Sequence, residues 1–319
     1  MSIADQSIII QEVAPRDGLQ IEPQWVETAD KVKLINRLSA AGFSRIEAGS
    51  FVSPKAVPAL RDSGDVFNRI ERRPGTIYVA LVPNRIGAER AILAKADELN
   101  FVLSASDTHN LANMGMTSEL SLLQLQQVMQ VARSGDTKVN ATIATAFGCP
   151  FEGRQDPDKI MRLLDRYLAL GVDGVTLADT TGMANPVQAS HLTSLALSRL
   201  PAEKLTLHFH NTRGLGLANI IACYAAGGRR FDAALGGLGG CPFAPGATGN
   251  VCTEDLVNLC HETDIHTGLD LDALIALARE LPALVGHDIA GQVAKAGRAC
   301  DLHPIPERVG RALRAAGSA

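Results

Sequence analysis

The sequence predicts an α/β fold of the (β/α)8 TIM-barrel class with a C-terminal helical extension. Short β-branched or apolar runs recur roughly every 30–40 residues, and each is followed by a longer segment with helical periodicity. No Gly-x-Gly-x-x-Gly turn follows the first run, so a doubly wound dinucleotide-binding sheet is the weaker alternative. Because barrels of this class accommodate 319 residues as one unit, we expect a single domain, with the barrel at about 8–268 and added helices at about 269–319.

Eight runs are predicted to be the barrel strands, at residues 8–13, 45–48, 77–82, 99–103, 139–144, 174–177, 205–210 and 231–235. The helices between and after them are predicted at residues 28–41, 54–70, 117–133, 156–170, 186–200, 215–226 and 253–262. Three of these helices end next to Gly42, Gly171 and Gly227, and glycine is the residue that most often ends a helix. Two further helices, at 269–281 and 290–298, are expected to pack against the barrel.

Composition and charge exclude several classes of protein. A hydrophobic content of 46% with 20% charged residues is ordinary for a globular protein with a large core. The net charge of −4 and the lack of a Lys/Arg cluster exclude a nucleic-acid partner. The sequence has no apolar run long enough to predict a membrane segment, and its first residues lack the basic region that is typical of a signal peptide. Six cysteines without a Cys-x-x-Cys pair do not form a disulfide framework, so we expect a cytoplasmic protein.

Polar side chains are concentrated where the predicted strands end. In such barrels the carboxyl ends of the strands meet at one face, and this face carries the reactive groups. The strand-end residues are Arg16, Asp17, Glu47, Ser104, Ser106, Asp107, Asp179, Thr180, His208 and His210. The loop after the eighth strand adds Cys241 and Asn250. These positions predict one active site.

Two histidines one residue apart predict a metal site. Side chains at i and i+2 of a strand point to the same face, so His208 and His210 can hold one ion together. With Asp17 and Asn250 they supply two nitrogens and two oxygens, which leaves positions for substrate and water on Mg²⁺ or Mn²⁺. Zinc is not excluded by the number of ligands. The alternative is a structural pair of Asp17 and His208, with His210 capping a loop.

Arg16 offers a fixed cation beside the predicted metal site. It can stabilise a developing enolate or bind a carboxylate with two hydrogen bonds. The alternative is a salt bridge to Glu47, and both interpretations hold if Glu47 positions the guanidinium.

The glycine-dense loop at 236–250 carries Cys241. Its glycines predict a mobile lid, and a thiol there can carry a proton once closure excludes water. Asp179 and Thr180 are expected to orient a ligand or His208 by hydrogen bonds. Surface or capping roles are expected for the other histidines, which are His109, His191, His261, His266, His287 and His303.

Four segments resemble the 3-hydroxy-3-methylglutaryl-CoA lyase family. They read VAPRDGLQ at 13–20, IEAGSFVSPKAVP at 46–58, LHFHNTRGLGLAN at 207–219 and GGLGGCPFAPGATGNVCTEDLV at 236–257. The resemblance spans about residues 8–268 and also connects the chain to a wider group of metal-dependent barrels, which includes isopropylmalate synthase.

The resemblance implies a retro-Claisen cleavage of an acyl-CoA ester and assigns residues to it. The expected metal ligands are Asp17, His208, His210 and Asn250. Arg16 would stabilise the enolate, Cys241 would transfer a proton, and Glu47 and Asp179 would support them. The expected substrate contacts are Gln20, Ser50, Ser106, Thr180 and Arg213. A homodimer is implied as well, while the pathway stays open, leucine degradation being one route.

Three departures from the family pattern are expected to lie near the pocket and to affect the substrate. They are Asn211 with Arg213 after the second histidine, Ala48-Gly49 after Glu47, and Asp107 in place of a glutamate. Arg213 is a candidate to bind a CoA phosphate or a substrate carboxylate. Citramalyl-CoA or a longer branched glutaryl-CoA is therefore a possible substrate. A condensing acyltransferase, and a barrel that binds metal or acyl-CoA without catalysis, are the remaining functional hypotheses.

Overall fold

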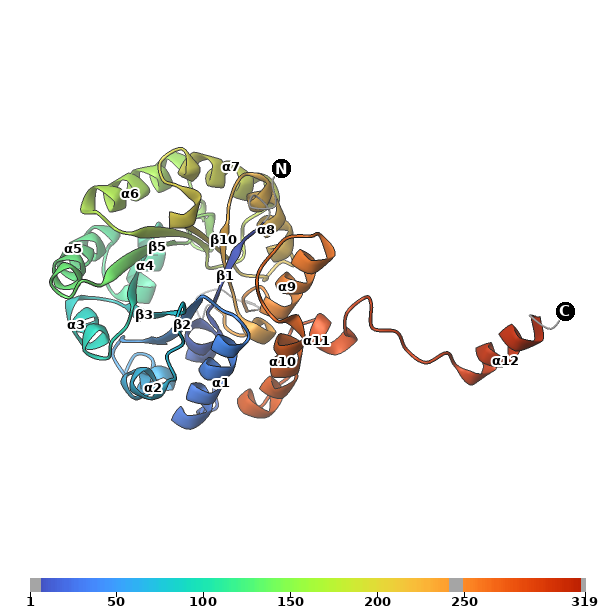
Figure 1. Ribbon diagram of the computed structural model, residues 1–319. Helices are drawn as coiled ribbons and strands as arrows, with labels where there is room; N and C mark the ends of the chain where they lie inside the picture. The colour runs from blue at the N-terminus through green and yellow to red at the C-terminus, as the bar shows by residue number, and fades with distance from the viewer. Residues whose placement is uncertain (1–6, 241–248, 317–319) are drawn as a thin grey trace.

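A closed barrel of eight parallel strands forms the centre of the molecule. The computed structural model describes residues 7–240 and 249–316. Neighbouring strands follow the order β1-β10-β9-β8-β5-β4-β3-β2, and helices surround the barrel (Figure 1). The strands are β1 (Ile9–Glu12), β2 (Arg45–Ser50), β3 (Ile77–Val82), β4 (Glu98–Ser104), β5 (Lys138–Ala144), β8 (Gly174–Asp179), β9 (Leu205–Phe209) and β10 (Arg230–Ala233). The predicted fold class is confirmed, and all eight predicted strands are present.

Twelve α-helices surround the barrel or form the C-terminal extension in the described residues. They are α1 (Thr28–Ala40), α2 (Ser63–Arg69), α3 (Arg85–Leu93), α4 (Asp107–Met114), α5 (Ser118–Ser134), α6 (Pro157–Leu170), α7 (Pro186–Leu197), α8 (Gly216–Ala225), α9 (Thr253–Glu262), α10 (Leu271–Val285), α11 (Val293–Ala296) and α12 (Glu307–Ala316). Gly42, Gly171 and Gly227 follow helices with φ of +106°, +79° and +104°, as expected for residues that end helices.

Two predicted helices are much shorter in the structure, and several elements were not predicted. The segment expected as a helix at 54–70 contains a 3₁₀ turn (Pro58–Leu60) before α2, because a proline inside a helix removes a backbone donor. The helix expected at 290–298 is reduced to α11, which ends at Gly297 with φ of +78°. Helices α3, α4 and α12 were not predicted, nor was the hairpin of β6 (Gly148–Cys149) and β7 (Gly153–Arg154).

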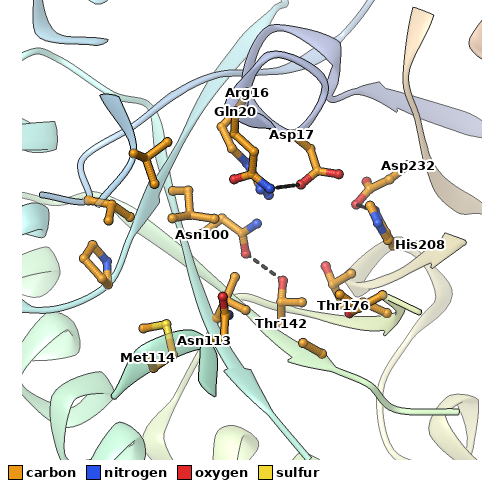
Figure 2. A pocket seen from close by; sticks show the side chains of 18 of the residues that line it. Arg16, Asp17, Gln20, Asn100, Asn113, Met114, Thr142, Thr176, His208 and Asp232 are labelled. Atoms are coloured by element: carbon orange, nitrogen blue, oxygen red, sulfur yellow. Dashed lines mark hydrogen bonds and ion pairs between the residues drawn. The ribbon is translucent and has the colours of Figure 1, made fainter. Parts of the chain in front are cut away.

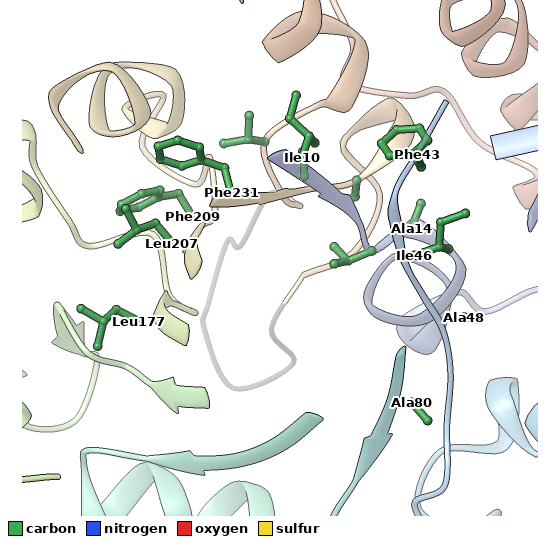
Figure 3. Close-up of a cluster of buried hydrophobic side chains, with 14 of the residues drawn as sticks. Ile10, Ala14, Phe43, Ile46, Ala48, Ala80, Leu177, Leu207, Phe209 and Phe231 are labelled. Carbon is green, nitrogen blue, oxygen red and sulfur yellow. The ribbon is translucent and has the colours of Figure 1, made fainter. Parts of the chain in front are cut away.

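The apolar core lies between the strands and the surrounding helices. Leu177, Leu207, Phe209 and Phe231 belong to this layer and are buried (Figure 3). The alternate residues of the same strands point into the barrel, because successive strand side chains face opposite sides. Polar and charged side chains occupy many of these inner positions, namely Gln11, Arg45, Glu47, Glu98, Asn100, Asn140, Thr142, Thr176, Thr206, His208, Arg230 and Asp232, and all are buried. The barrel interior is therefore a hydrogen-bonded polar network.

The C-terminal segment leaves the barrel. Helix α10 packs beside α9 and carries buried leucines, whereas α12 has no buried residue and lies away from the barrel (Figure 1). None of the described helices is long and apolar enough to cross a membrane.

Candidate active site

Asp17, His208 and His210 form the centre of the site. Asp17 lies on a π-helical turn (Ala14–Gly18) after β1, His208 lies on β9, and His210 follows β9 directly. One ligand atom from each residue lies within 4.8 Å of the others, and the two imidazole rings are 5.1 Å apart. The expected same-face arrangement of the two histidines is therefore present.

Asn250 completes this group from the other end of the glycine loop. Its backbone forms a β-bridge with His210, and its Nδ2 donates to Asp17 Oδ2 at 2.7 Å and to the Leu238 carbonyl at 2.9 Å. Asn250 Oδ1 and His210 Nδ1 are buried, and neither has a hydrogen-bond partner among the described residues. Buried polar atoms without a partner are rare in proteins, so two of them in a cluster of O and N donors fit a divalent cation.

The electrostatics of Asp17 and His210 favour metal ligation. Burial alone would raise the pKa of Asp17, but Arg16, His210 and His208 outweigh it and lower this pKa to about 2. Burial and the neighbouring His208 lower the pKa of His210 to about 4. A carboxylate and a neutral imidazole are the protonation states that bind metals.

Arg16 is held between two carboxylates at the cavity wall. Its Nε donates to Glu47 Oε2 at 2.6 Å, and its Nη1 donates to Asp17 Oδ1 at 2.7 Å. Asn100 Nδ2 donates to the second oxygen of Glu47 at 2.8 Å. The predicted salt bridge is thus present, and it holds a guanidinium that lines the cavity. The functional role of Arg16 stays a prediction.

The cavity opens at the carboxyl ends of the strands and has a volume of about 420 Å³. Figure 2 shows Arg16, Asp17 and Gln20 on one side of it and His208 with Asp232 close together. Its wall combines two kinds of side chain. The polar part includes Arg16, Asp17, Gln20, Asn100, Thr142, Thr180, His208, His210 and Asp232. The apolar part includes Ile21, Val52, Ala56, Val57, Leu81, Val82, Pro83, Val102 and Met114.

The structure brings only some of the predicted substrate contacts to this wall. Gln20 and Thr180 line the cavity, and Gln20 donates to Asp17 Oδ1 at 3.1 Å. Ser50, Ser106 and Arg213 are not among its described lining residues. Ser106 Oγ instead caps α4 by accepting from the His109 amide, and the exposed Arg213 donates to the Gly182 carbonyl at 2.7 Å.

None of the family departures is among the residues that line the described cavity, although Asn211 directly follows the lining residue His210. Ala48 faces the apolar layer, and Gly49 packs so closely against α2 that a Cβ there would lie 2.8 Å from Ser63 Oγ. Asp107 Oδ1 accepts from the backbone and hydroxyl of Ser118, and Asn211 Oδ1 accepts from the Gly216 amide.

Asp232, not Asp179, is the hydrogen-bond partner of His208. His208 Nδ1 lies 3.2 Å from Asp232 Oδ2. Asp179 Oδ1 instead accepts from the Met183 and Ala184 amides, and burial raises the pKa of Asp179 to about 6. The expectation that Asp179 orients His208 is therefore wrong, whereas the alternative that it orients a ligand stays a prediction. Asp179 holds the turn that presents Thr180 to the cavity.

Two further residues of the site have functions that were not predicted. His109 is buried and lines the cavity with its Nδ1 2.7 Å from Ser104 Oγ, so the expected surface or capping role is wrong for this histidine. The other five histidines of that group are exposed, as expected.

Asp232 could have been identified from the sequence, because it is the single carboxylate within an otherwise apolar predicted strand. Cys241 lies outside the described residues.

The fold and the Asp17, His208 and His210 cluster define a TIM-barrel protein with a candidate metal site at the carboxyl ends of its strands. Within this class, the chain belongs to the HMGL-like family, whose model matches residues 7–281. The predicted resemblance is confirmed, and the chain is a carbon–carbon lyase.

Three known proteins show how similar the relatives are. Hydroxymethylglutaryl-CoA lyase YngG of Bacillus subtilis is 42% identical, over 88% of this chain and 94% of that protein. The (R)-citramalyl-CoA lyase of Chloroflexus aurantiacus is 43% identical, over 92% of this chain and 95% of that protein. The structure of an HMG-CoA lyase from Acinetobacter baumannii, in complex with coenzyme A and 3-methylmalate, is 61% identical with a TM-score of 0.94 and covers 96% of this chain and 100% of that chain.

Proposed function

We propose that this protein is a divalent-metal-dependent lyase that cleaves 3-hydroxy-3-methylglutaryl-CoA to acetyl-CoA and acetoacetate. The observation that carries the proposal is the fixed Arg16 guanidinium, which lines the same cavity as the Asp17, His208 and His210 cluster. A lyase of this kind needs a cation for the developing enolate next to a group that activates the hydroxyl, and the cavity wall presents both.

The reaction is a retro-Claisen cleavage. The C3 hydroxyl loses its proton, the C2–C3 bond breaks, and the C3 oxygen becomes the ketone of acetoacetate. The electron pair of the broken bond moves to the thioester as an enolate, which takes up a proton at C2 to give acetyl-CoA. Atoms and charge balance because the proton lost at the hydroxyl is matched by the proton gained at C2.

We assign Asp17, His208, His210 and Asn250 to hold Mg²⁺ or Mn²⁺. When bound, the cation supplies the Lewis acidity that makes the C3 hydroxyl a stronger acid. Two oxygen and two nitrogen donors are compatible with these ions and leave room for substrate oxygens. The buried, unpartnered Asn250 Oδ1 and His210 Nδ1 support this assignment.

The other residues bind and stabilise the reacting groups. Arg16 donates hydrogen bonds to the enolate oxygen, and Glu47 keeps its guanidinium in place through the bond at Nε. Gln20 and Thr180 offer polar contacts at the cavity wall. We assign proton delivery at C2 to Cys241, on the basis of the family resemblance.

The apolar wall supports a second candidate, which is a 3-hydroxyglutaryl-CoA with a larger branched substituent at C3. Val57, Leu81, Pro83 and Met114 line the cavity in addition to the polar residues that a methyl-bearing substrate would need. Apolar surface of this extent stabilises a bound hydrocarbon group by removing it from water.

The test is a substrate panel with and without metal. Purified protein is incubated with Mg²⁺ or Mn²⁺ and with 3-hydroxy-3-methylglutaryl-CoA, citramalyl-CoA and a longer C3-branched glutaryl-CoA, and acetyl-CoA is measured. Metal-dependent release of acetoacetate supports the first candidate, whereas release of pyruvate identifies a citramalyl-CoA lyase. No release from any ester, together with condensation of acetyl-CoA and a 2-oxo acid, would overturn the lyase in favour of an acyltransferase. Binding of CoA without any turnover would indicate a non-catalytic barrel.

A homodimer and a cytoplasmic location stay predictions. Light scattering of the purified protein tests the first, and fractionation of the source cells tests the second.

A further inference from the structure

Three polar residues lie side by side on three adjacent strands inside the barrel. Gln11 on β1 is the register partner of Asp232 on β10, and Asp232 is the register partner of His208 on β9. Gln11 Nε2 donates to Asp232 Oδ1 at 3.1 Å, and Asp232 Oδ2 lies 3.2 Å from His208 Nδ1. All three side chains are buried. Their spacing is fixed by the backbone hydrogen bonds between the three strands.

We infer that Asp232 is a positioning residue that selects the tautomer of His208 and aims its Nε2 at the metal, and that Gln11 and Arg45 hold Asp232 in place for this purpose. The inference rests on the metal site proposed above. It gives a function to a residue that contacts the cavity but is not one of the three clustered ligands.

The direction of each hydrogen bond in the row follows from the chemistry of arginine. A guanidinium only donates, so Arg45 Nε must donate to Gln11 Oε1, at 3.0 Å. The amide of Gln11 is thereby oriented with its NH₂ group toward Asp232. A carboxylate only accepts, so Asp232 takes one hydrogen from Gln11 and one from His208 Nδ1. The proton on Nδ1 leaves Nε2 with the lone pair that a metal requires.

The far end of the row is anchored in the same way. Arg45 forms a buried ion pair with Glu98 near the amino ends of the strands. The chain Glu98, Arg45, Gln11, Asp232 and His208 therefore runs from the floor of the barrel to the metal cluster without a break. Because every donor in it is fixed, the ring of His208 cannot flip without leaving a buried group unpaired.

The first test is the replacement Asp232→Asn, read out as Mn²⁺ affinity by electron paramagnetic resonance titration. In either orientation the new amide points its NH₂ group at a donor, Gln11 Nε2 or His208 Nδ1. We expect Mn²⁺ to bind about 10–100-fold more weakly, the usual loss when the partner of a metal-bound histidine is changed. Asp97→Asn is the matched control, since Asp97 is held outside this row by the Tyr78 amide at 2.8 Å and should leave the affinity unchanged.

A rescue variant separates positioning from a general structural effect. In the double variant Gln11→Glu, Asp232→Asn, the new carboxylate accepts from both Arg45 and the new amide, whose oxygen can then accept from His208 Nδ1. Every hydrogen bond of the row then has one donor and one acceptor again, with the bond between positions 11 and 232 reversed, and the total charge is unchanged. We expect the double variant to bind Mn²⁺ at least ten-fold more tightly than Asp232→Asn if that single variant loses a hundred-fold in affinity. The single variant Gln11→Glu places a second carboxylate beside Asp232 and should bind Mn²⁺ more weakly than wild type.

A measurement on the unaltered protein does not depend on the folding of any variant. Two-bond ¹H–¹⁵N NMR spectra of histidine-labelled, metal-free protein should show His208 protonated at Nδ1. A neutral His208 ring protonated at Nε2 and not at Nδ1 would overturn the inference, as would an Asp232→Asn protein that binds Mn²⁺ within two-fold of wild type. A loss of turnover in Asp232→Asn with unchanged Mn²⁺ affinity would mean that Asp232 acts on the substrate instead. Failure of the wild type to bind Mn²⁺ would count against the proposed metal site, and the NMR result would still decide the tautomer.

Discussion

Arg16, on the turn that follows β1, and Glu47, on the neighbouring strand β2, form a buried ion pair, with Nε and Nη2 of the guanidinium both 2.6 Å from the same carboxylate oxygen. Nη1 of the same guanidinium is bound to Asp17, a proposed metal ligand. The pair therefore connects the cation proposed to stabilise the enolate with the site proposed to hold the metal, and a change in one alters the geometry of the other.

The replacement Arg16→Lys should lower kcat by about 10²–10³-fold, the usual effect of removing a fixed donor to a developing oxyanion. A single ammonium group cannot bind Glu47 and Asp17 in the fork geometry of arginine. Steady-state kinetics with the substrate found in the panel measures the effect. Arg37→Lys in the surface pair with Glu280 is the control, and it should leave kcat unchanged. Turnover within two-fold of wild type in Arg16→Lys would exclude the proposed role.

Divalent metal should stabilise the folded protein. A ligand that binds only the native state at 100 times its Kd adds about 2.7 kcal/mol to the free energy of unfolding. We expect Mn²⁺ to raise Tm, a chelator to reverse this, and His210→Ala to remove most of the increase. Among the described residues His210 Nδ1 has no hydrogen-bond partner. Without metal, the replacement should therefore lower the free energy of unfolding mainly through lost packing contacts of the ring. Exposed His191→Ala should keep the full Mn²⁺ shift, measured by differential scanning fluorimetry.

Narrowing the apolar wall should change the substrate preference. Val57→Phe adds volume at the cavity, so kcat/KM for a substrate with a long C3 branch should fall roughly 10–200-fold relative to the methyl substrate. The ratio of the two values, measured in competition, is the relevant quantity. Leu93→Phe serves as the control, because Leu93 is 83% exposed at the end of α3. An unchanged ratio in Val57→Phe would show that the branch binds elsewhere.

Glu12 should make stability depend on pH. Its carboxylate accepts from the Ala14 and Leu235 amides and from Thr253 Oγ1, and it thus joins the Asp17 turn to the glycine loop and to α9. Burial nevertheless raises the pKa of Glu12 from 4.5 to about 7. Between these values the native state holds a proton that the unfolded state has lost, so this residue lowers the free energy of unfolding as pH rises, by up to about 3 kcal/mol.

The replacement Glu12→Gln removes this titration and keeps an oxygen for the two amides. Relative to wild type, the variant should therefore gain stability between pH 5 and pH 8, as measured by urea unfolding. A difference between the two proteins that does not change with pH would contradict the raised pKa. Glu254, whose pKa burial also raises to about 7, is present in both proteins, and its charge contributes to the raised pKa of Glu12, so the difference between the proteins includes the coupling of the two groups.

Much of the fold could be predicted because the periodicity of apolar residues that distinguishes strands from helices can be read within short segments of the sequence. Alternating apolar runs place β3 at the predicted residues, and helix α9 matches its predicted bounds. Helix α4 was missed because its sequence, DTHNLANM, carries few apolar residues. Helix α3 was missed because its large apolar residues Ile86 and Leu93 are exposed and only small residues are buried. Their positions depend on the βα connections of the barrel.

The sequence by itself determined the fold class and the candidate ligands, since the two-residue spacing of His208 and His210 on a strand fixes the face they share, and Asp17 follows another strand end. Only the tertiary structure decided the partners of these residues. Asp232 rather than Asp179 contacts His208, because the register between β9 and β10 places Asp232 directly beside it. Register between strands distant in the sequence depends on the closure of the barrel, so residue spacing along the chain cannot reveal it.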